Sequence, residues 1–296
     1  MERLKASDFP QEVLKLFDGY VHGMLSRREF LDGASKFAVG GFTAAAMLEN
    51  LRPNYALAAQ VAKDDPRLKT EFVTYSSPLG TGNVKGYLAR PAKAAKKLPA
   101  IVVIHENRGL NPYIEDVTRR LALEGYIAFA PDALTPLGGY PGNEEAAVKL
   151  FATLDPAARL NDLVTGAYYV KNHAESNGRL GAVGFCFGGG ICNIFAARIP
   201  ELLASVPYYG AQLPAADVPN IKAPLMIHYA GLDERINAGW PAYEKALKAN
   251  NKAFEMFMYP NTNHGFHNDT TPRYDEAAAK LSWQRTLDFF KKHVKG

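Results

Sequence analysis

One cysteine of this sequence lies in a pattern that is typical of an enzyme nucleophile. The segment Gly184-Phe185-Cys186-Phe187-Gly188 has the form Gly-x-Cys-x-Gly, the nucleophile elbow Gly-x-Ser-x-Gly with sulfur in place of oxygen. An elbow holds its nucleophile in a strained turn between a strand and a helix, where only small neighbours fit, and the helix N-terminus favours a thiolate. We therefore predict that Cys186 attacks a carbonyl carbon; the alternative is a tight turn with a buried, inert thiol.

An acid and a histidine follow the cysteine in the chain order that an elbow requires. Asp233 comes just after the apolar segment 224–229 and before Glu234, and His264 follows the segment 254–259. An acid in this place orients a histidine, which in turn accepts the proton of the nucleophile. For Asp233 the alternative is a turn or helix-cap acid. For His264 the competitor is His267, one turn later.

The loop after residues 101–104 is expected to complete the site. Its segment His105-Glu106-Asn107-Arg108 should lie beside the elbow. The backbone N–H groups of Phe187 and Asn107 would then form the oxyanion hole. A carboxylate such as Glu106 next to a thiol–imidazole pair would alter which group holds the proton. The alternative for Glu106 is a solvated charge or a partner for Arg108.

Alternating apolar strands and amphipathic helices must position these loops. After a hairpin, the run Ile101-Val102-Val103-Ile104 is apolar throughout, as expected of a strand buried on both faces of a sheet. The order predicts a doubly wound, mostly parallel sheet of about eight strands with helices on both faces. The expected strands are 72–75, 84–89, 101–104, 126–130, 181–185, 203–209, 224–229 and 254–259.

Composition limits the kinds of partner. The chain has 296 residues, of which 47% are hydrophobic, and a net charge of +4, which is too small to indicate nucleic-acid binding. Its two cysteines, Cys186 and Cys192, point in different directions from an elbow and its helix, so we expect no disulfide. No Cys/His cluster has zinc spacing in the sequence. We expect neither a metal nor a cofactor.

Residues 1–58 have the features of an export leader. Ser26-Arg27-Arg28-Glu29-Phe30-Leu31 resembles a twin-arginine signal, and Ala56-Leu57-Ala58 offers a cleavage site. The intervening apolar run is too short for a stable membrane anchor. These features predict a catalytic domain over 59–296, a periplasmic or secreted location, and the twin-arginine export machinery as a partner. The alternative is a cytoplasmic protein in which 1–58 form an uncleaved helical arm.

The motifs together resemble the dienelactone hydrolase, or carboxymethylenebutenolidase-like, family of the α/β-hydrolase superfamily. The resemblance covers about residues 70–293 and rests on Glu106, Gly184-Phe185-Cys186-Phe187-Gly188-Gly189, Asp233 and His264-Gly265-Phe266. It implies an α/β-hydrolase fold and a Cys186–His264–Asp233 triad. It also implies a Glu106 that interacts with the thiol and takes its proton when substrate binds, and cleavage of a small-molecule enol-lactone or related ester without a metal.

The expected substrate-binding arginines depart from the family pattern. The resemblance implies one arginine at about 141–150 and another a few residues past the catalytic histidine, which together hold a substrate carboxylate. This sequence has no arginine from Pro131 to Ala158, and the first one after His264 is Arg273. Arg108 or Arg273 would have to replace the missing contacts. The reaction type is therefore better predicted than the substrate.

Two other functions compete with hydrolysis. A thiol-based redox or electrophile sensor on the same scaffold would also use a reactive cysteine, but the sequence offers no C-x-x-C and no obvious resolving cysteine. A non-catalytic binding protein would not need a cysteine, an acid and a histidine in this order. Both alternatives are less favoured than a cysteine hydrolase.

Overall fold

A mostly parallel sheet forms the body of the protein. The computed structural model describes residues 4–39, 42–57 and 59–295. Its eight strands lie in the order β1-β2-β4-β3-β5-β6-β7-β8. The pairs β1–β2 and β2–β4 are antiparallel and the other pairs are parallel. The strands are β1 (Leu68–Ser77), β2 (Gly82–Pro91), β3 (Leu98–Ile104), β4 (Ile127–Pro131), β5 (Ser176–Phe185), β6 (Leu202–Tyr208), β7 (Leu225–Ala230) and β8 (Phe254–Tyr259).

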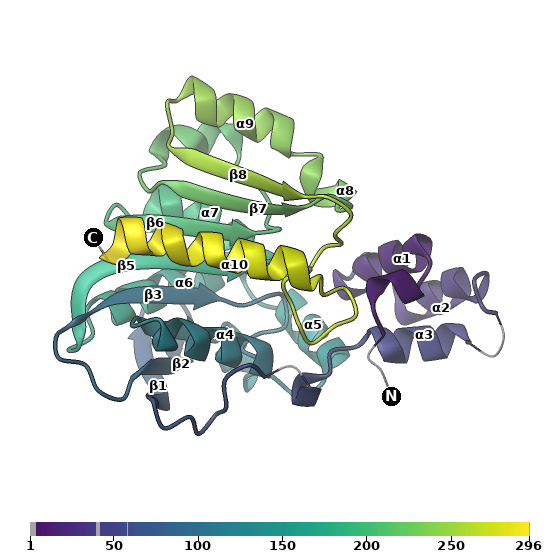
Figure 1. Ribbon diagram of the computed structural model, residues 1–296, viewed down its shortest axis with the longest axis horizontal. Coiled ribbons are helices and arrows are strands. Elements are labelled where there is room, and N and C mark those ends of the chain that lie inside the picture. Colours follow the sequence, from purple (N-terminus) through teal and green to yellow (C-terminus); the bar gives the residue numbers. More distant parts are fainter. Residues whose placement is uncertain (1–3, 40–41, 58, 296) are drawn as a thin grey trace.

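Helices cover both faces of this sheet and explain why its central strands are apolar. Every residue of β3 is buried, because α4 and α10 pack on one face and α6, α7 and α9 contribute to the core on the other (Figure 1). The predicted fold class is therefore confirmed. The body helices are α4 (Pro112–Leu123), α5 (Glu144–Ala152), α6 (Pro156–Lys171), α7 (Phe187–Arg198), α8 (Glu234–Asn237), α9 (Trp240–Ala249) and α10 (Glu276–Phe290).

The parallel strands all end at one edge of the sheet, and the loops at that edge carry the candidate residues. Glu106 follows β3, Cys186 follows β5, Asp233 follows β7 and His264 follows β8. Because the carboxyl ends of parallel strands meet at the same edge, residues far apart in the chain come together there.

A three-helix arm lies beyond this carboxyl edge (Figure 1). It consists of α1 (Gln11–Val21), α2 (Arg27–Ser35) and α3 (Ala44–Leu51), which enclose a small core of their own around Phe17, Phe30 and Leu48. The twin-arginine motif begins α2. The Ser26 side chain accepts a hydrogen bond from the Glu29 N–H (3.2 Å), and the Glu29 carboxylate accepts one from the Ser26 N–H (2.7 Å). This reciprocal pair is a capping box, so the local sequence specifies a helix start.

The predicted leader includes the three helices of the arm. Residues 1–58 contain the helices of the alternative arm, but export and cleavage stay predictions. Ala58, at the expected cleavage site, lies outside the described residues. No helix in the part of the chain that the structure describes is long and apolar enough to cross a membrane.

Candidate active site

The backbone at Cys186 has the strained geometry of a nucleophile elbow. Cys186 lies between β5 and α7 with φ of 56° and ψ of −112°, a conformation that is costly for a residue with a side chain. A Cβ on Gly188 would lie 2.2 Å from the Ile104 carbonyl oxygen, and one on Gly184 would lie 2.2 Å from the Gly188 carbonyl oxygen. Both contacts are with backbone, so only glycine fits at these positions.

Asp233 and His264 meet at the carboxyl ends of β7 and β8. The Nδ1 atom of His264 lies 2.5 Å from Oδ2 of Asp233, and a carboxylate can only accept, so Nδ1 carries the hydrogen. Asp233 also caps α8, because its Oδ1 accepts from the Ile236 N–H at 3.2 Å. Burial opposes ionisation of Asp233, but the neighbouring His264 lowers the pKa of the carboxyl below its ordinary value. Asp233 thus makes both of the contacts considered from the sequence: it accepts a hydrogen bond from His264 and it caps a helix.

The competing acid and histidine lie elsewhere. Glu234 is exposed and pairs with Lys15 at 2.7 Å. His267 is buried with its Nδ1 atom 2.7 Å from the Tyr113 hydroxyl. Burial and the nearby Arg120 lower the pKa of His267 well below its ordinary value, which keeps it neutral. Its place is in the core beneath the site.

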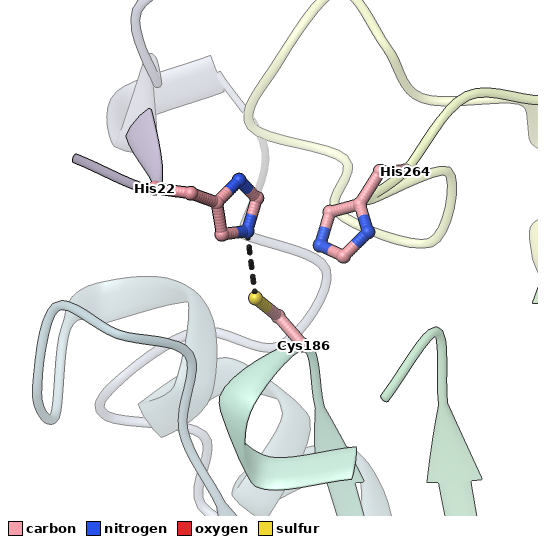
Figure 2. A group of neighbouring side chains, drawn as sticks. All are labelled: His22, Cys186 and His264. Atoms are coloured by element: carbon pink, nitrogen blue, oxygen red, sulfur yellow. Dashed lines mark hydrogen bonds between the residues drawn. The ribbon is translucent and has the colours of Figure 1, made fainter. Parts of the chain in front are cut away.

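The hydrogen bond of the Cys186 thiol joins it to a histidine that the sequence analysis missed. Sγ of Cys186 lies 3.2 Å from Nε2 of His22, which comes from the arm (Figure 2). His264 lies beside both, and donor atoms of the three side chains are within 4.8 Å of one another. Nε2 of His264 is buried and has no hydrogen-bond partner among the described residues. An available signal was the spacing of Asp18 and His22 in the sequence, because residues four positions apart share one face of a helix.

Glu106 and Arg108 pair with each other and with other residues, not with the thiol. Oε2 of Glu106 accepts from Asn268 Nδ2 at 3.1 Å and lies 3.4 Å from a terminal nitrogen of Arg108. Nε of Arg108 lies 2.7 Å from the Glu144 carboxylate. Glu106 is therefore a partner of Arg108, while its transfer of the thiol proton on substrate binding stays a prediction. With 4% of its surface exposed, Arg108 is held between two carboxylates.

Arg273 is also engaged, and a different arginine reaches the cavity. Arg273 is buried, lies 3.4 Å from Asp18 and stacks over the ring of Phe17 at 5.1 Å. Arg235, which the sequence analysis did not single out, is exposed and lies beside the thiol cavity. Among the arginines that the structure describes, Arg235 is the one in the lining of this cavity.

A cavity of about 300 Å³ opens in front of the thiol. Phe187 is the first residue of α7, so its N–H has no acceptor within the helix and is available to an oxyanion. Asn107 also lies in the wall, where its side-chain amide donates to the Val21 carbonyl oxygen at 2.9 Å. The residues that surround the reacting atoms are His22, Asn107, Cys186, Phe187, Tyr209 and His264.

The same cluster is the one group of described residues with the spacing of metal ligands. His22, Cys186 and His264 supply one sulfur and two nitrogen donors, a set that zinc accepts. The guanidinium of Arg235, however, lies 3.2 Å from Nε2 of His22, and its charge opposes a divalent cation. Cys192 stays apart from this group, since it is fully buried in α7 and burial raises the pKa of its thiol.

A buried carboxylate braces the loop that carries Glu106 and Asn107. Oδ1 of Asp132 accepts from the Leu110 N–H at 3.1 Å and from the Leu134 N–H at 3.0 Å, and so joins the loops after β3 and β4. Burial raises the pKa of Asp132 from its ordinary 3.8 to about 6.

Replacing Asp132 by asparagine should therefore change how stability depends on pH. Between pH 3.8 and about 6 the folded protein keeps a proton that the unfolded chain releases. The stability that protonated Asp132 contributes is thus fully present below its unfolded-state pKa of 3.8, and it is lost as the pH rises through the folded-state pKa of about 6. In the wild type we expect the free energy of unfolding to fall by about 3 kcal/mol between pH 4 and 7 because of this group. Asp132→Asn, which keeps the acceptor oxygen, should lack this fall. Urea unfolding across this range measures it, with exposed Asp64→Asn as the control; parallel curves for wild type and Asp132→Asn would contradict the expectation.

Comparisons with known proteins agree with this architecture. The dienelactone hydrolase family profile matches residues 84–294, and a YqhI-like profile matches residues 1–39. YghX of Escherichia coli (strain K12), named a "putative hydrolase fragment", is 58% identical over 38% of this chain and 97% of its own length. A "putative carboxymethylenebutenolidase" of Escherichia coli O157:H7 is 34% identical over 74% of this chain and 86% of its own. The crystal structure of a "putative dienelactone hydrolase" from Klebsiella pneumoniae subsp. pneumoniae MGH 78578 is 31% identical with a TM-score of 0.68, covering 76% of this chain and 100% of that one.

Proposed function

The chain belongs to the dienelactone hydrolase family and is a hydrolase of lactone or ester bonds, and from this premise we propose that Cys186 is its nucleophile in a Cys-His-Asp triad. One observation carries the proposal. A thiol held at a strained elbow faces a cavity and lies next to a histidine that is oriented by a buried carboxylate. Strain of this kind persists in folded proteins mainly where function requires it.

The chemistry begins with attack of the Cys186 thiolate on the carbonyl carbon of the ester. The carbonyl oxygen becomes an oxyanion, which the N–H of Phe187 stabilises together with the N–H of Asn107. Collapse expels the alkoxide, which leaves with the proton that the thiol gave to a neighbouring imidazole, and an acyl group remains on sulfur. A water molecule, deprotonated by His264 whose imidazolium Asp233 stabilises, then releases the acid and restores the thiol.

The substrate that suits the cavity is a small lactone or ester. Its free space of about 300 Å³ lies at the lower end of the range of small-molecule sites. Arg108 and Arg273 are buried and paired with carboxylates. Arg235 also lies 3.3 Å from the Asp18 carboxylate, but it is exposed and lines the cavity, so we propose Arg235 as the group that attracts a substrate carboxylate. A dienelactone-like enol-lactone has both the ring ester and such a carboxylate.

Trapping the acyl-enzyme tests the nucleophile directly. After rapid acid quenching of a reaction with an activated aryl acetate, we expect one acetyl group on the protein, located by fragmentation mass spectrometry at Cys186 and removed by hydroxylamine. Cys192 is the internal control, since it is fully buried and should stay unmodified. An acyl group on any other residue, or hydrolysis with no sulfur-bound intermediate under any quench time, would overturn the proposal.

A further inference from the structure

Two acid–imidazole pairs, from opposite ends of the chain, face the single thiol of Cys186. One is Asp233–His264 in the body. The other is Asp18–His22 in the arm, where Nδ1 of His22 lies 3.2 Å from the Asp18 carboxylate and 2.7 Å from the Asp18 carbonyl oxygen. A single triad accounts for only the first pair. The second occupies the position next to the sulfur (Figure 2).

The environment of His22 suits a proton acceptor. Both acceptors on Asp18 face Nδ1, so this nitrogen carries a hydrogen and Nε2 is left to accept the proton of the thiol. His22 is also the cap residue that directly follows the last residue of α1, and the carboxyl end of a helix stabilises a positive charge. The helix end and the contacts with Asp18 and Cys186 therefore all favour a His22 that accepts a proton and becomes positively charged.

The charges around His22 favour an imidazolium beside a thiolate. Four groups face its ring: Asp18 from α1, Cys186 from the elbow, His264 from the loop after β8 and Arg235 from α8. Burial, His264 and the Arg235 guanidinium at 3.2 Å oppose the charged ring, but a Cys186 thiolate and the hydrogen bond to Asp18 outweigh them and raise the pKa of His22 above its ordinary value. Burial likewise opposes ionisation of Asp18, but the histidines and Arg273 lower the pKa of its carboxyl.

The other histidine is left free for a different step. The rings of His22 and His264 meet edge to face at 4.8 Å between centroids, and Nε2 of His264 has no partner among the described residues although it is buried. An unpaired basic nitrogen beside the sulfur is placed to bind the water that hydrolyses an acyl-enzyme.

We propose that His22 is a second catalytic histidine, which accepts the Cys186 proton during acylation and passes it to the leaving alkoxide, while His264 activates water for deacylation. Asp18 is the positioning residue of His22. This division of labour rests on the proposed function, because it assigns the two proton transfers of that reaction to separate histidines.

The proton balance closes in both steps. In acylation the thiol proton moves to Nε2 of His22, sulfur bonds to the carbonyl carbon, and the alkoxide leaves with the proton from His22. In deacylation water gives a proton to Nε2 of His264 and its oxygen bonds to the same carbon. The carbon–sulfur bond then breaks, and the proton on His264 returns to the sulfur.

The proposal makes the arm part of the active centre. The arm is held against the body by a hydrogen bond from Gln11 to Asn263 (2.7 Å), by an ion pair of Lys15 with Glu234 (2.7 Å) and by the amide of Asn107 on the Val21 carbonyl. Cleavage after residue 58 would remove His22. We therefore expect the active enzyme to retain its arm.

The rate of Cys186 alkylation by iodoacetamide as a function of pH tests the role of His22 without any substrate. With the full-length protein, we expect His22→Gln to move the rise in alkylation to higher pH and to lower the rate at pH 7 about 10-fold or more, because the thiolate loses its counter-ion. The control is His173→Gln, a half-buried histidine that lies before β5 and therefore at the opposite end of that strand from Cys186, which should behave as wild type. Asp18→Asn, which keeps His22, should shift the profile in the same direction but less.

A second readout separates acylation from deacylation. In single-turnover experiments His22→Gln should slow acyl-enzyme formation about 100-fold and leave the hydrolysis of a preformed acyl-enzyme unchanged. The proposal would be overturned if folded His22→Gln kept the wild-type alkylation profile. It would also be overturned if His264→Gln shifted this profile and His22→Gln did not. Should His22→Gln not fold, an unshifted profile in Asp18→Asn would overturn it instead. Failure of the proposed function would be recognised separately, as ester hydrolysis that does not require Cys186.

Discussion

Replacement of Cys186 by alanine is expected to lower kcat for ester or lactone hydrolysis by about 10⁴-fold or more, with the residual rate supplied by the cavity and its N–H groups. Alanine keeps the Cβ and therefore the strained backbone at φ of 56°, so the elbow should persist. Steady-state kinetics with an activated ester and a small lactone measure the effect. Cys192→Ala is the matched control. Cys192 lies in α7, just after Cys186, and is fully buried in the protein core, so its replacement should leave kcat unchanged.

Cys186→Ser adds a second comparison at the same position. A hydroxyl is a weaker nucleophile than a thiol and needs a stronger base, so we expect serine to keep little activity. If Cys186→Ala hydrolysed esters at the wild-type rate, this would contradict the proposal that Cys186 is the nucleophile.

Replacement of His264 by glutamine is expected to lower kcat by about 10³- to 10⁴-fold, as loss of a triad histidine does. Its imidazole is held by Asp233 at 2.5 Å, and glutamine cannot accept the proton of water. Because His22 remains next to the sulfur, we expect acylation to continue, so the variant should release one equivalent of the first product and then stall. Quenched-flow kinetics and intact-protein mass spectrometry would show the burst and the stable acyl adduct.

The control for this variant is again His173→Gln, which should turn over without a stall. A His264→Gln protein with normal turnover would remove His264 from the mechanism. A variant that loses the burst as well as turnover would mean that His264 serves both steps, and would contradict the separate role of His22 while leaving the hydrolase intact.

The sequence alone was sufficient to predict the body of the fold. Apolar runs such as 101–104 and 254–259 became the buried strand β3 and the strand β8, because strand and helix periodicity is a local property of the chain. The elbow could also be recognised locally, since crowding of backbone atoms at Gly184 and Gly188 restricts those positions to glycine. The placement of Asp233 and His264 at one edge followed from their positions just after strands.

The roles of the charged residues were decided by tertiary structure. Arg108 and Glu106 are close in sequence, but only the fold brings Glu144 to Arg108 and Asn268 to Glu106. Arg273 is occupied by Asp18 for the same reason. A charged side chain buried on folding must find a partner, and no local pattern indicates which one it will find.

The arm shows this limit most clearly. Its Ser26-Arg27-Arg28 segment has the composition of a signal and the capping of a helix, and local sequence is compatible with both. The contact of His22 with Cys186 spans 164 positions and exists only because the arm docks across the carboxyl edge of the sheet. Residues that do not share an element are brought together by packing of apolar surfaces and pairing of buried charges, which depend on the whole structure.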